Sequence, residues 1–247
     1  MPSLLAIIPH PDDESYSFGG TIALAARAGW RCHVECATYG ERGQRHDGGP
    51  ADPDSLAETR EEELANSCKV LWAEDPTFWG LPDGDLRLHR GEIERIHRLF
   101  RELQPTLVLT LGPDGAYGHP DHIAVYRWVR DAWESFPGER PPLLHAAFPR
   151  GLFLPQYEKC LGMMGSPPTP AAHELGVDRA HYEIPIIQVE RVKLRSIAAH
   201  HSQLPGGEVD AIFPPGIVPQ LTAVERFNDA RGAVVEETTQ LLASLQT

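Results

Sequence analysis

The stretch LLAIIPHPDDES, residues 4–15, places a cluster of charge directly after an apolar run. Its first five residues are all apolar, which predicts a buried strand covered on both faces. One histidine and three acids follow closely, at His10, Asp12, Asp13 and Glu14. Carboxylates this close repel one another, and the pKa of one rises, unless a cation lies between them. The stretch therefore predicts a metal ion at the carboxyl end of the first strand.

Strands and helices alternate after this turn. A helix is expected over residues 17–28, where Gly29 can end it, and a strand over 32–39. A second all-apolar strand is expected over 106–111. Such alternation is typical of α/β proteins, so we expect a Rossmann-like, mostly parallel sheet with helices on both faces. Ligands of such sheets bind outside the carboxyl ends of the strands.

The pattern predicts one domain over residues 1–247. The segment 137–181 is dense in proline and glycine, and we expect long loops there rather than a domain boundary. The last amphipathic helix is expected over 222–245.

A second polar motif, GHPDH, follows the strand at 106–111. Parallel neighbouring strands would bring its His119 and His122 to the same sheet edge as His10. Histidine and aspartate suit zinc, which needs at least three protein ligands, and Fe²⁺ accepts similar ones. Either motif alone is more often a proline-assisted turn with a capping aspartate. Two such motifs, each after a buried strand, favour a metal site.

Composition excludes several classes of function. The net charge is -13 and the 22 Lys and Arg residues are scattered, so nucleic acid is not expected as a partner. Because no basic segment followed by an apolar run opens the chain and no run could span a bilayer, we expect a soluble, cytoplasmic protein without a membrane partner. The four cysteines lack CxxC spacing and are expected to be free thiols in a reducing compartment.

Beyond these patterns, the sequence resembles a known family. It carries PHPDDE with a following Gly-Gly, TYGERG, TREEEL, PDG, GHPDH and KLRSIAAHHSQ in one order across most of residues 4–203. In these motifs it is similar to the PIG-L/LmbE family of zinc-dependent deacetylases, which remove acetyl groups from N-acetylglucosamine-type amides. The resemblance implies a small-molecule partner, an N-acetylated amino sugar, and assembly into a homo-oligomer.

The resemblance also implies roles for individual residues. Asp12 would be the general base beside a metal-activated water, whose pKa zinc lowers toward ~7. His119 would polarise the scissile carbonyl or protonate the leaving amine, a proton that Asp12 could also deliver. Tyr117 would assist the oxyanion, and Asp121 would orient an imidazole. The implied zinc ligands are His10, Asp13 and His122.

Substrate contacts are implied on the other side of the metal. Arg60 matches the substrate-side arginine of the family, although it can equally be a solvated partner of the neighbouring glutamates. Asp83 would accept hydrogen bonds from sugar hydroxyls, and Glu41 and Arg42 would border the pocket. His200 fits the HxSQ pattern of the family, with a structural role. Segment 137–181 could form the walls that select the aglycone.

Two other functions fit parts of the pattern. An amidase that cleaves a thiol-sugar conjugate would use the same core. A noncatalytic metal-binding or nucleotide-binding Rossmann-like module is a different class. The turn lacks GxGxxG, and its acids would repel a pyrophosphate. The presence of Asp12, which is not needed as a ligand, favours catalysis.

Overall fold

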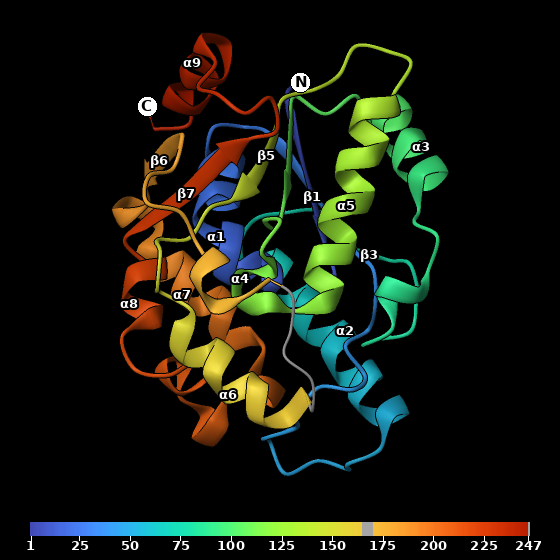
Figure 1. The fold of residues 1–247 in the computed structure, drawn as a ribbon, viewed down its shortest axis with the longest axis vertical. Coiled ribbons are helices and arrows are strands. Elements are labelled where there is room, and N and C mark those ends of the chain that lie inside the picture. Colours follow the sequence, from blue (N-terminus) through green and yellow to red (C-terminus); the bar gives the residue numbers. More distant parts are fainter. Residues whose placement is uncertain (165–169, 247) are drawn as a thin grey trace.

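The structure, a computed structural model, describes residues 1–164 and 170–246. Its centre is a seven-stranded sheet in the order β3-β2-β1-β4-β5-β7-β6 (Figure 1). Strands β1 to β5 are parallel, whereas β7 runs antiparallel to both β5 and β6. The predicted α/β class is therefore confirmed. The strands are β1 Ser3–Ile8, β2 Arg31–Cys36, β3 Thr77–Phe78, β4 Leu107–Thr110, β5 Leu143–Ala146, β6 Tyr182–Pro185 and β7 Val224–Asp229.

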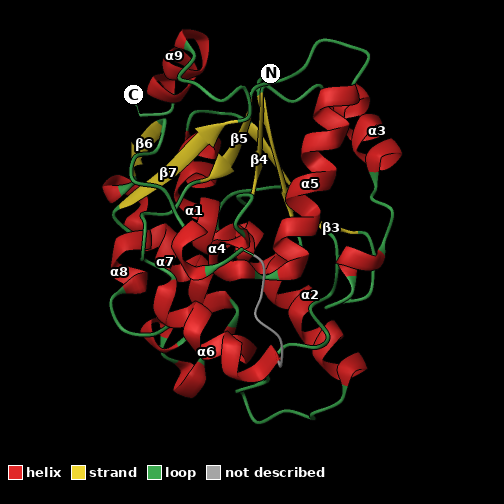
Figure 2. Ribbon diagram, in the orientation of Figure 1, coloured by secondary structure: helices red, strands yellow, loops and turns green. Residues whose placement is uncertain are grey.

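Helices cover both faces of this sheet (Figure 2). The α-helices are α1 Asp13–Arg27, α2 Pro53–Val70, α3 Ile93–Leu103, α4 Gly115–Gly118, α5 Pro120–Ser135, α6 Leu154–Met164, α7 Glu190–Ala199, α8 Ile217–Leu221 and α9 Glu236–Ser244. Short 3-10 helices span Leu86–Leu88, Ala172–Glu174, Ile187–Val189, His201–Gln203, Pro205–Gly207 and Val209–Ala211. Among the described residues, no helix is both long and apolar enough to cross a membrane.

Strand β1 is the centre of both hydrophobic cores. Its alternate residues Leu4, Ala6 and Ile8 pack on the side of α1 and α7, and Leu5 and Ile7 pack on the side of α3 and α5. All five are fully buried. Burial on both faces explains why this strand is apolar throughout rather than alternating.

Two expectations about the second half of the chain need correction. The helix predicted over 222–245 is wrong, because strand β7 occupies its first part and only α9 is helical. The inward positions of β7 alternate but include the buried acids Glu225 and Asp229, which hide the two-residue hydrophobic period. The loop-rich segment 137–181, of which 165–169 lie outside the described residues, also contains β5 and α6, which were not predicted.

The topology brings the two polar motifs together. Strand β1 lies between β2 and β4, so the chain first builds the sheet on one side of β1 and then on the other. The carboxyl ends of β1 and β4 are neighbours at this switch point, where ligands of open α/β sheets bind. The PHPDDE turn follows β1, and the GHPDH segment follows β4 a few residues further on.

Helix α1, which begins in the first motif, is fixed to the far side of the fold by buried polar contacts. The backbone N–H of Gly20 donates to Glu225 Oε1 over 2.7 Å, and Lys193 Nζ lies 2.5 Å from the same oxygen. Lys193 also donates to the carbonyl of Tyr16 over 2.8 Å. Gly20 has no room for a side chain, since an added Cβ would lie 2.5 Å from Ile186 Cγ2.

The glycine pair of α1 provides a test of this packing. Gly20→Ala should lower the free energy of unfolding by about 1–3 kcal/mol, because Ile186 and the helix must move apart. Gly19→Ala is the matched control: its Cβ would meet nothing closer than 3.4 Å, and alanine is the better helix former. Urea denaturation should show stability unchanged or raised in the control. Equal losses in both variants would contradict this packing.

Candidate metal centre and active site

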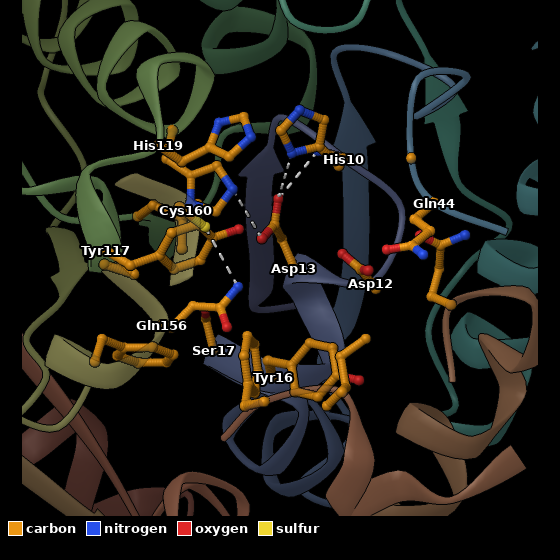
Figure 3. A pocket seen from close by; sticks show the side chains of 18 of the residues that line it. His10, Asp12, Asp13, Tyr16, Ser17, Gln44, Tyr117, His119, Gln156 and Cys160 are labelled. Atoms are coloured by element: carbon orange, nitrogen blue, oxygen red, sulfur yellow. Dashed lines mark hydrogen bonds and ion pairs between the residues drawn. The ribbon is translucent and has the colours of Figure 1, made fainter. Parts of the chain in front are cut away.

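His10, Asp13 and His122 meet at the carboxyl edge of the sheet. The carboxylate of Asp13, the first residue of α1, lies between the two imidazoles, 3.4 Å from His10 Nδ1 and 3.4 Å from His122 Nε2 (Figure 3). All three side chains are buried. The backbone N–H of His10 donates to Asp13 over 3.1 Å, which ties the carboxylate to the strand end. These are the three residues predicted to be metal ligands.

The other nitrogen of His10 faces two further carboxylates. His10 Nε2 lies 3.0 Å from Asp83 Oδ1 and 3.3 Å from Asp121 Oδ2. Burial alone would lower the pKa of His10, but its hydrogen bonds with Asp121, Asp13 and Asp83 raise that pKa well above the usual value. Asp83 and Asp121 hold a proton on Nε2, and a metal ion would replace the second proton at Nδ1, the arrangement common around metal-binding histidines.

Asp121 is itself held in place by the loop that follows β3. It is fully buried and accepts hydrogen bonds from the backbone N–H groups of Gly84, over 2.7 Å, and Leu86, over 3.1 Å. The prediction that Asp121 orients an imidazole stays a prediction. In this geometry the imidazole is that of His10, from the other motif.

His119 and Tyr117 lie beside the metal ligands. His119 Nδ1 accepts the backbone N–H of Asp121 over 3.3 Å, so its Nε2 is available to the pocket. The Tyr117 ring lies 5.8 Å from that of His119 and 5.5 Å from that of His122. Burial lowers the pKa of both histidines well below the usual value, which favours the neutral form that binds metals.

The donor set permits two further arrangements. Ligand atoms of His10, His119 and His122 all lie within 4.8 Å of one another, and so do those of His10, Asp83 and Asp121. The described residues therefore contain a group that can hold a metal ion, and either Asp13 or His119 can complete it around the other two histidines.

Asp12 lies at the edge of the metal-binding group in an unusual conformation. Its φ of 119° is in the left-handed region that side chains rarely adopt. Its N–H donates to Glu14 Oε2 over 3.0 Å, and its Oδ2 accepts from Arg60 Nη2 over 3.2 Å. Burial raises the pKa of Asp12 to about 7, although Arg60 opposes the shift. Asp12 thus has a strained backbone and a carboxylate that faces the pocket.

Arg60 is buried in this turn rather than solvated. It is 4% exposed and donates to the carbonyls of Gly40, over 2.9 Å, and Pro11. The alternative in which Arg60 is a solvated partner of neighbouring glutamates is therefore wrong: the side chain points inward because two carbonyls and Asp12 surround it.

Glu14 and His200 form a buried support that the motifs alone did not reveal. Glu14 Oε1 lies 2.7 Å from His200 Nε2 and accepts the Ser67 hydroxyl over 2.5 Å. The Glu14 and His200 side chains are fully buried. Because Glu14 also holds the N–H of Asp12, this contact links the end of α7 to the first motif. The role of His200 in this structure is to hold Glu14.

The residues predicted to touch substrate differ in their positions. Both oxygens of Asp83 are engaged, one by His10 and the other by the N–H of Arg42 over 2.9 Å. Glu41 accepts the N–H of Asp83 over 2.8 Å and so supports that residue. The side chain of Arg42 lines the pocket and pairs with Asp85 over 3.0 Å.

A pocket of about 430 Å³ opens over the metal-binding group. The sequence did not indicate most of its lining, because these residues come from scattered segments without a shared motif. Its polar lining includes Arg42, Gln44, His46 and Gln203, and its apolar lining includes Tyr16, Leu111, Tyr117, Phe148, Phe153, Ile212 and Phe213.

Several buried polar atoms at this pocket have no hydrogen-bond partner among the described residues: Tyr16 Oη, Arg60 Nε and Gln156 Oε1. Buried polar groups are nearly always paired in proteins. These atoms lie behind the pocket surface, where ordered water can pair with them.

The α/β sheet carries a buried group of His and Asp side chains at its switch point, with the carboxylate of Asp12 beside it. This arrangement is typical of metal-dependent enzymes. Comparison with known sequences agrees. The chain belongs to the PIG-L family, whose sequence profile, described as GlcNAc-PI de-N-acetylase, matches residues 5–133. This is a family of amide hydrolases, and the predicted resemblance is confirmed.

Individual relatives cover most of the chain. A probable N-acetyl-alpha-D-glucosaminyl L-malate deacetylase 2 of Bacillus subtilis is 31% identical over 82% of this chain and 84% of that protein. A 1D-myo-inositol 2-acetamido-2-deoxy-alpha-D-glucopyranoside deacetylase of Saccharomonospora viridis is 29% identical over 98% and 100%. The structure of N,N'-diacetylchitobiose deacetylase from Pyrococcus horikoshii shares the fold, with a TM-score of 0.63 at 20% identity over 92% of this chain and 83% of that one.

Metal analysis can separate the predicted group of His10, Asp13 and His122 from the three-histidine group. We expect Asp13→Ala to reduce bound metal from about one ion per chain to almost none, because a third ligand is lost. His119→Ala should retain the metal. Inductively coupled plasma mass spectrometry after loading with zinc measures both. Loss of metal in His119→Ala but not in Asp13→Ala would assign the three-histidine group instead.

Adjacent histidines test the buried support. His200→Ala should lower the free energy of unfolding by about 3 kcal/mol, because the Glu14 charge stays buried without its partner. His201→Ala is the control: that side chain is 61% exposed, and the buried Glu63 that it pairs with keeps hydrogen bonds from the Ser202 N–H and hydroxyl, so the loss should be at most about 1 kcal/mol.

The effect of His200→Ala should also depend on pH. Burial alone would lower the pKa of His200, but Glu14 raises it above the usual value, so the folded state holds this proton more tightly than the unfolded chain. The stabilisation is complete below about pH 6.5 and is lost as pH rises through the raised pKa. Urea denaturation at acidic and at alkaline pH measures the stability lost in each variant. Equal losses in His200→Ala and His201→Ala at both pH values would contradict the supporting role of the Glu14–His200 pair.

Proposed function

We propose that this protein is a zinc-dependent hydrolase that removes the acetyl group from an N-acetylglucosamine-type amino sugar or its glycoside. The observation that carries the proposal is Asp12, a carboxylate beside the metal-binding group that is not needed as a ligand. Family membership and the deacetylases among the relatives support the same reaction. The polar lining of the pocket, with Arg42, Gln44 and His46, suits a substrate rich in hydroxyl groups.

His10, Asp13 and His122 would hold the zinc ion. Two imidazoles and one carboxylate are a donor set that zinc accepts while leaving a position open. The carboxylates behind His10 Nε2 support this fit, because they orient the ring and keep a proton on the distal nitrogen. When bound, zinc would supply Lewis acidity to the water and to the amide carbonyl.

Asp12 acts as the general base. Its carboxylate takes a proton from the water that attacks the amide carbon, and general-base catalysis of this kind contributes about 10²–10⁴-fold. Arg60 and Glu14 hold the residue from two sides, at the carboxylate and at the backbone N–H. These two contacts hold the carboxylate of Asp12 in one position at the pocket.

His119 and Tyr117 act on the other side of the amide. His119 donates to the carbonyl oxygen or to the leaving amine, and Asp121 N–H fixes its ring. The Tyr117 hydroxyl faces the oxyanion, where the loss of one donor typically costs ~3 kcal/mol. The products are acetate and the free amine of the sugar.

Asp12→Asn tests the proposal most directly. The variant should retain zinc while kcat for N-acetylglucosamine glycosides falls by about 10²–10⁴-fold, since an amide cannot accept the proton. A fluorescamine assay of freed amine over methyl, malate and inositol glycosides measures turnover, and metal analysis measures zinc.

The control is Asp178→Asn, which changes an aspartate 81% exposed on the surface. It should leave both turnover and zinc unchanged. Wild-type turnover of none of the glycosides would overturn the proposed function, whereas full activity in Asp12→Asn would overturn only the assignment of the base.

A further inference from the structure

One side of the pocket is a continuous row of aromatic rings. Phe153 lies 4.8 Å from Phe148, 5.3 Å from Phe213 and 6.0 Å from Tyr117, measured between ring centroids. Phe213 in turn lies 5.0 Å from Tyr16. We call these five residues the aromatic wall. They come from four separate segments of the chain, so the wall is a product of the tertiary structure.

The wall begins at the reacting centre and extends away from it. Tyr117 contacts both His119 and His122 through its ring. Phe148 and Phe153 are buried beyond it, and Phe213 is half-buried. Gln156 of α6 lies on the same side, with its amide between Tyr117 and Tyr16 (Figure 3).

The opposite side of the pocket is polar. Gln44 lies across the Asp12–Asp13 pair from Tyr117 (Figure 3). Gln203 is on the same side as Gln44, since a Cβ at Gly43 would lie 2.8 Å from Gln203 Oε1. Arg42 and His46 belong to the same loop after β2. The hydroxyl groups of an amino sugar find more hydrogen-bond partners here than along the aromatic wall, where Gln156 is the polar side chain beside the rings.

The two substituents of a secondary amide, one on nitrogen and one on the carbonyl carbon, point in opposite directions. The group is planar and trans, so the carbon on nitrogen and the carbon on the carbonyl point away from each other. If the sugar on nitrogen occupies the polar side, the acyl group must point to the aromatic wall. Three of these rings are already buried by the protein, so the free apolar surface is mainly that of the half-buried Tyr117 and Phe213, which an acetyl methyl would cover only in part.

We propose that the aromatic wall is an acyl-binding subsite, and that the enzyme hydrolyses N-acyl amino sugars whose acyl group is larger and more apolar than acetyl. The inference rests on the proposed function and adds the substrate class. Water adds to the carbonyl carbon, the C–N bond breaks, and one water proton passes to the leaving nitrogen. The products are a carboxylate with an apolar chain and the free amino sugar.

The energetic basis is the burial of the acyl chain against the rings. Each methylene removed from water is expected to raise kcat/KM by about fourfold, as long as it stays in contact with the wall. The gain therefore reaches about 10²-fold for a few added methylenes. The gain in kcat/KM should stop once the acyl chain is too long to stay in contact with Phe213.

The experiment compares methyl glycosides of glucosamine that carry N-acetyl, N-butanoyl, N-hexanoyl and N-phenylacetyl groups. Freed amine gives kcat/KM for each, which should rise along the series. Phe213→Ala should lower the ratio of hexanoyl to acetyl kcat/KM by about tenfold. Phe136→Ala, which changes a ring outside this pocket, should leave the ratio unchanged.

Binding gives a second readout that does not depend on turnover. Titration calorimetry of the zinc-loaded Asp12→Asn variant with the same glycosides should show tighter binding and a more negative heat-capacity change for hexanoyl than for acetyl. Equal or weaker kcat/KM and affinity for the longer acyl groups would overturn this inference and leave deacetylation intact. If phenyl N-acetylglucosaminide, measured in the same assay, gained in kcat/KM while the longer acyl groups did not, the wall would bind the aglycone and the inference would be overturned as well.

Discussion

The structure depends on how five carboxylates are accommodated at one buried edge of a sheet. Each has a specific partner: Asp13 has two imidazoles, Glu14 has His200 and Ser67, and Asp12 has Arg60. Asp83 and Asp121 share the far nitrogen of His10. Buried charge without such partners would cost several kcal/mol per group. The pairing explains why segments far apart in the chain must converge here.

This constraint connects the fold to the site. Helix α1 cannot shift without moving Asp13 and Glu14, and it is also held at Gly20 by Glu225 and at Tyr16 by Lys193. Helix α7 therefore supports the catalytic turn twice, through Lys193 and through His200, although neither lines the pocket. Catalytic groups held on a strand end and a helix start are positioned more precisely than groups on a free loop.

The metal-binding residues and the apolar lining of the pocket come from different parts of the chain. The metal-binding residues lie within the part that matches the PIG-L profile, residues 5–133. Much of the aromatic wall lies beyond it, including Phe148, Phe153 and Phe213. The predicted metal ligands and most of the aromatic wall therefore lie in different segments of the sequence.

The sequence by itself determined the α/β class, the metal-binding type of site and the residues of the two HPD motifs, because an apolar strand that ends in a group of His and Asp side chains must neutralise their charge at the sheet edge. It did not determine β7, whose buried Glu225 and Asp229 hide the strand period. Nor did it show that Asp121 faces His10, that Arg60 is buried, or that Glu14 rests on His200. Only the tertiary structure decided these contacts, because each joins residues brought together by the sheet order, and no local pattern records which distant partner will neutralise a buried charge.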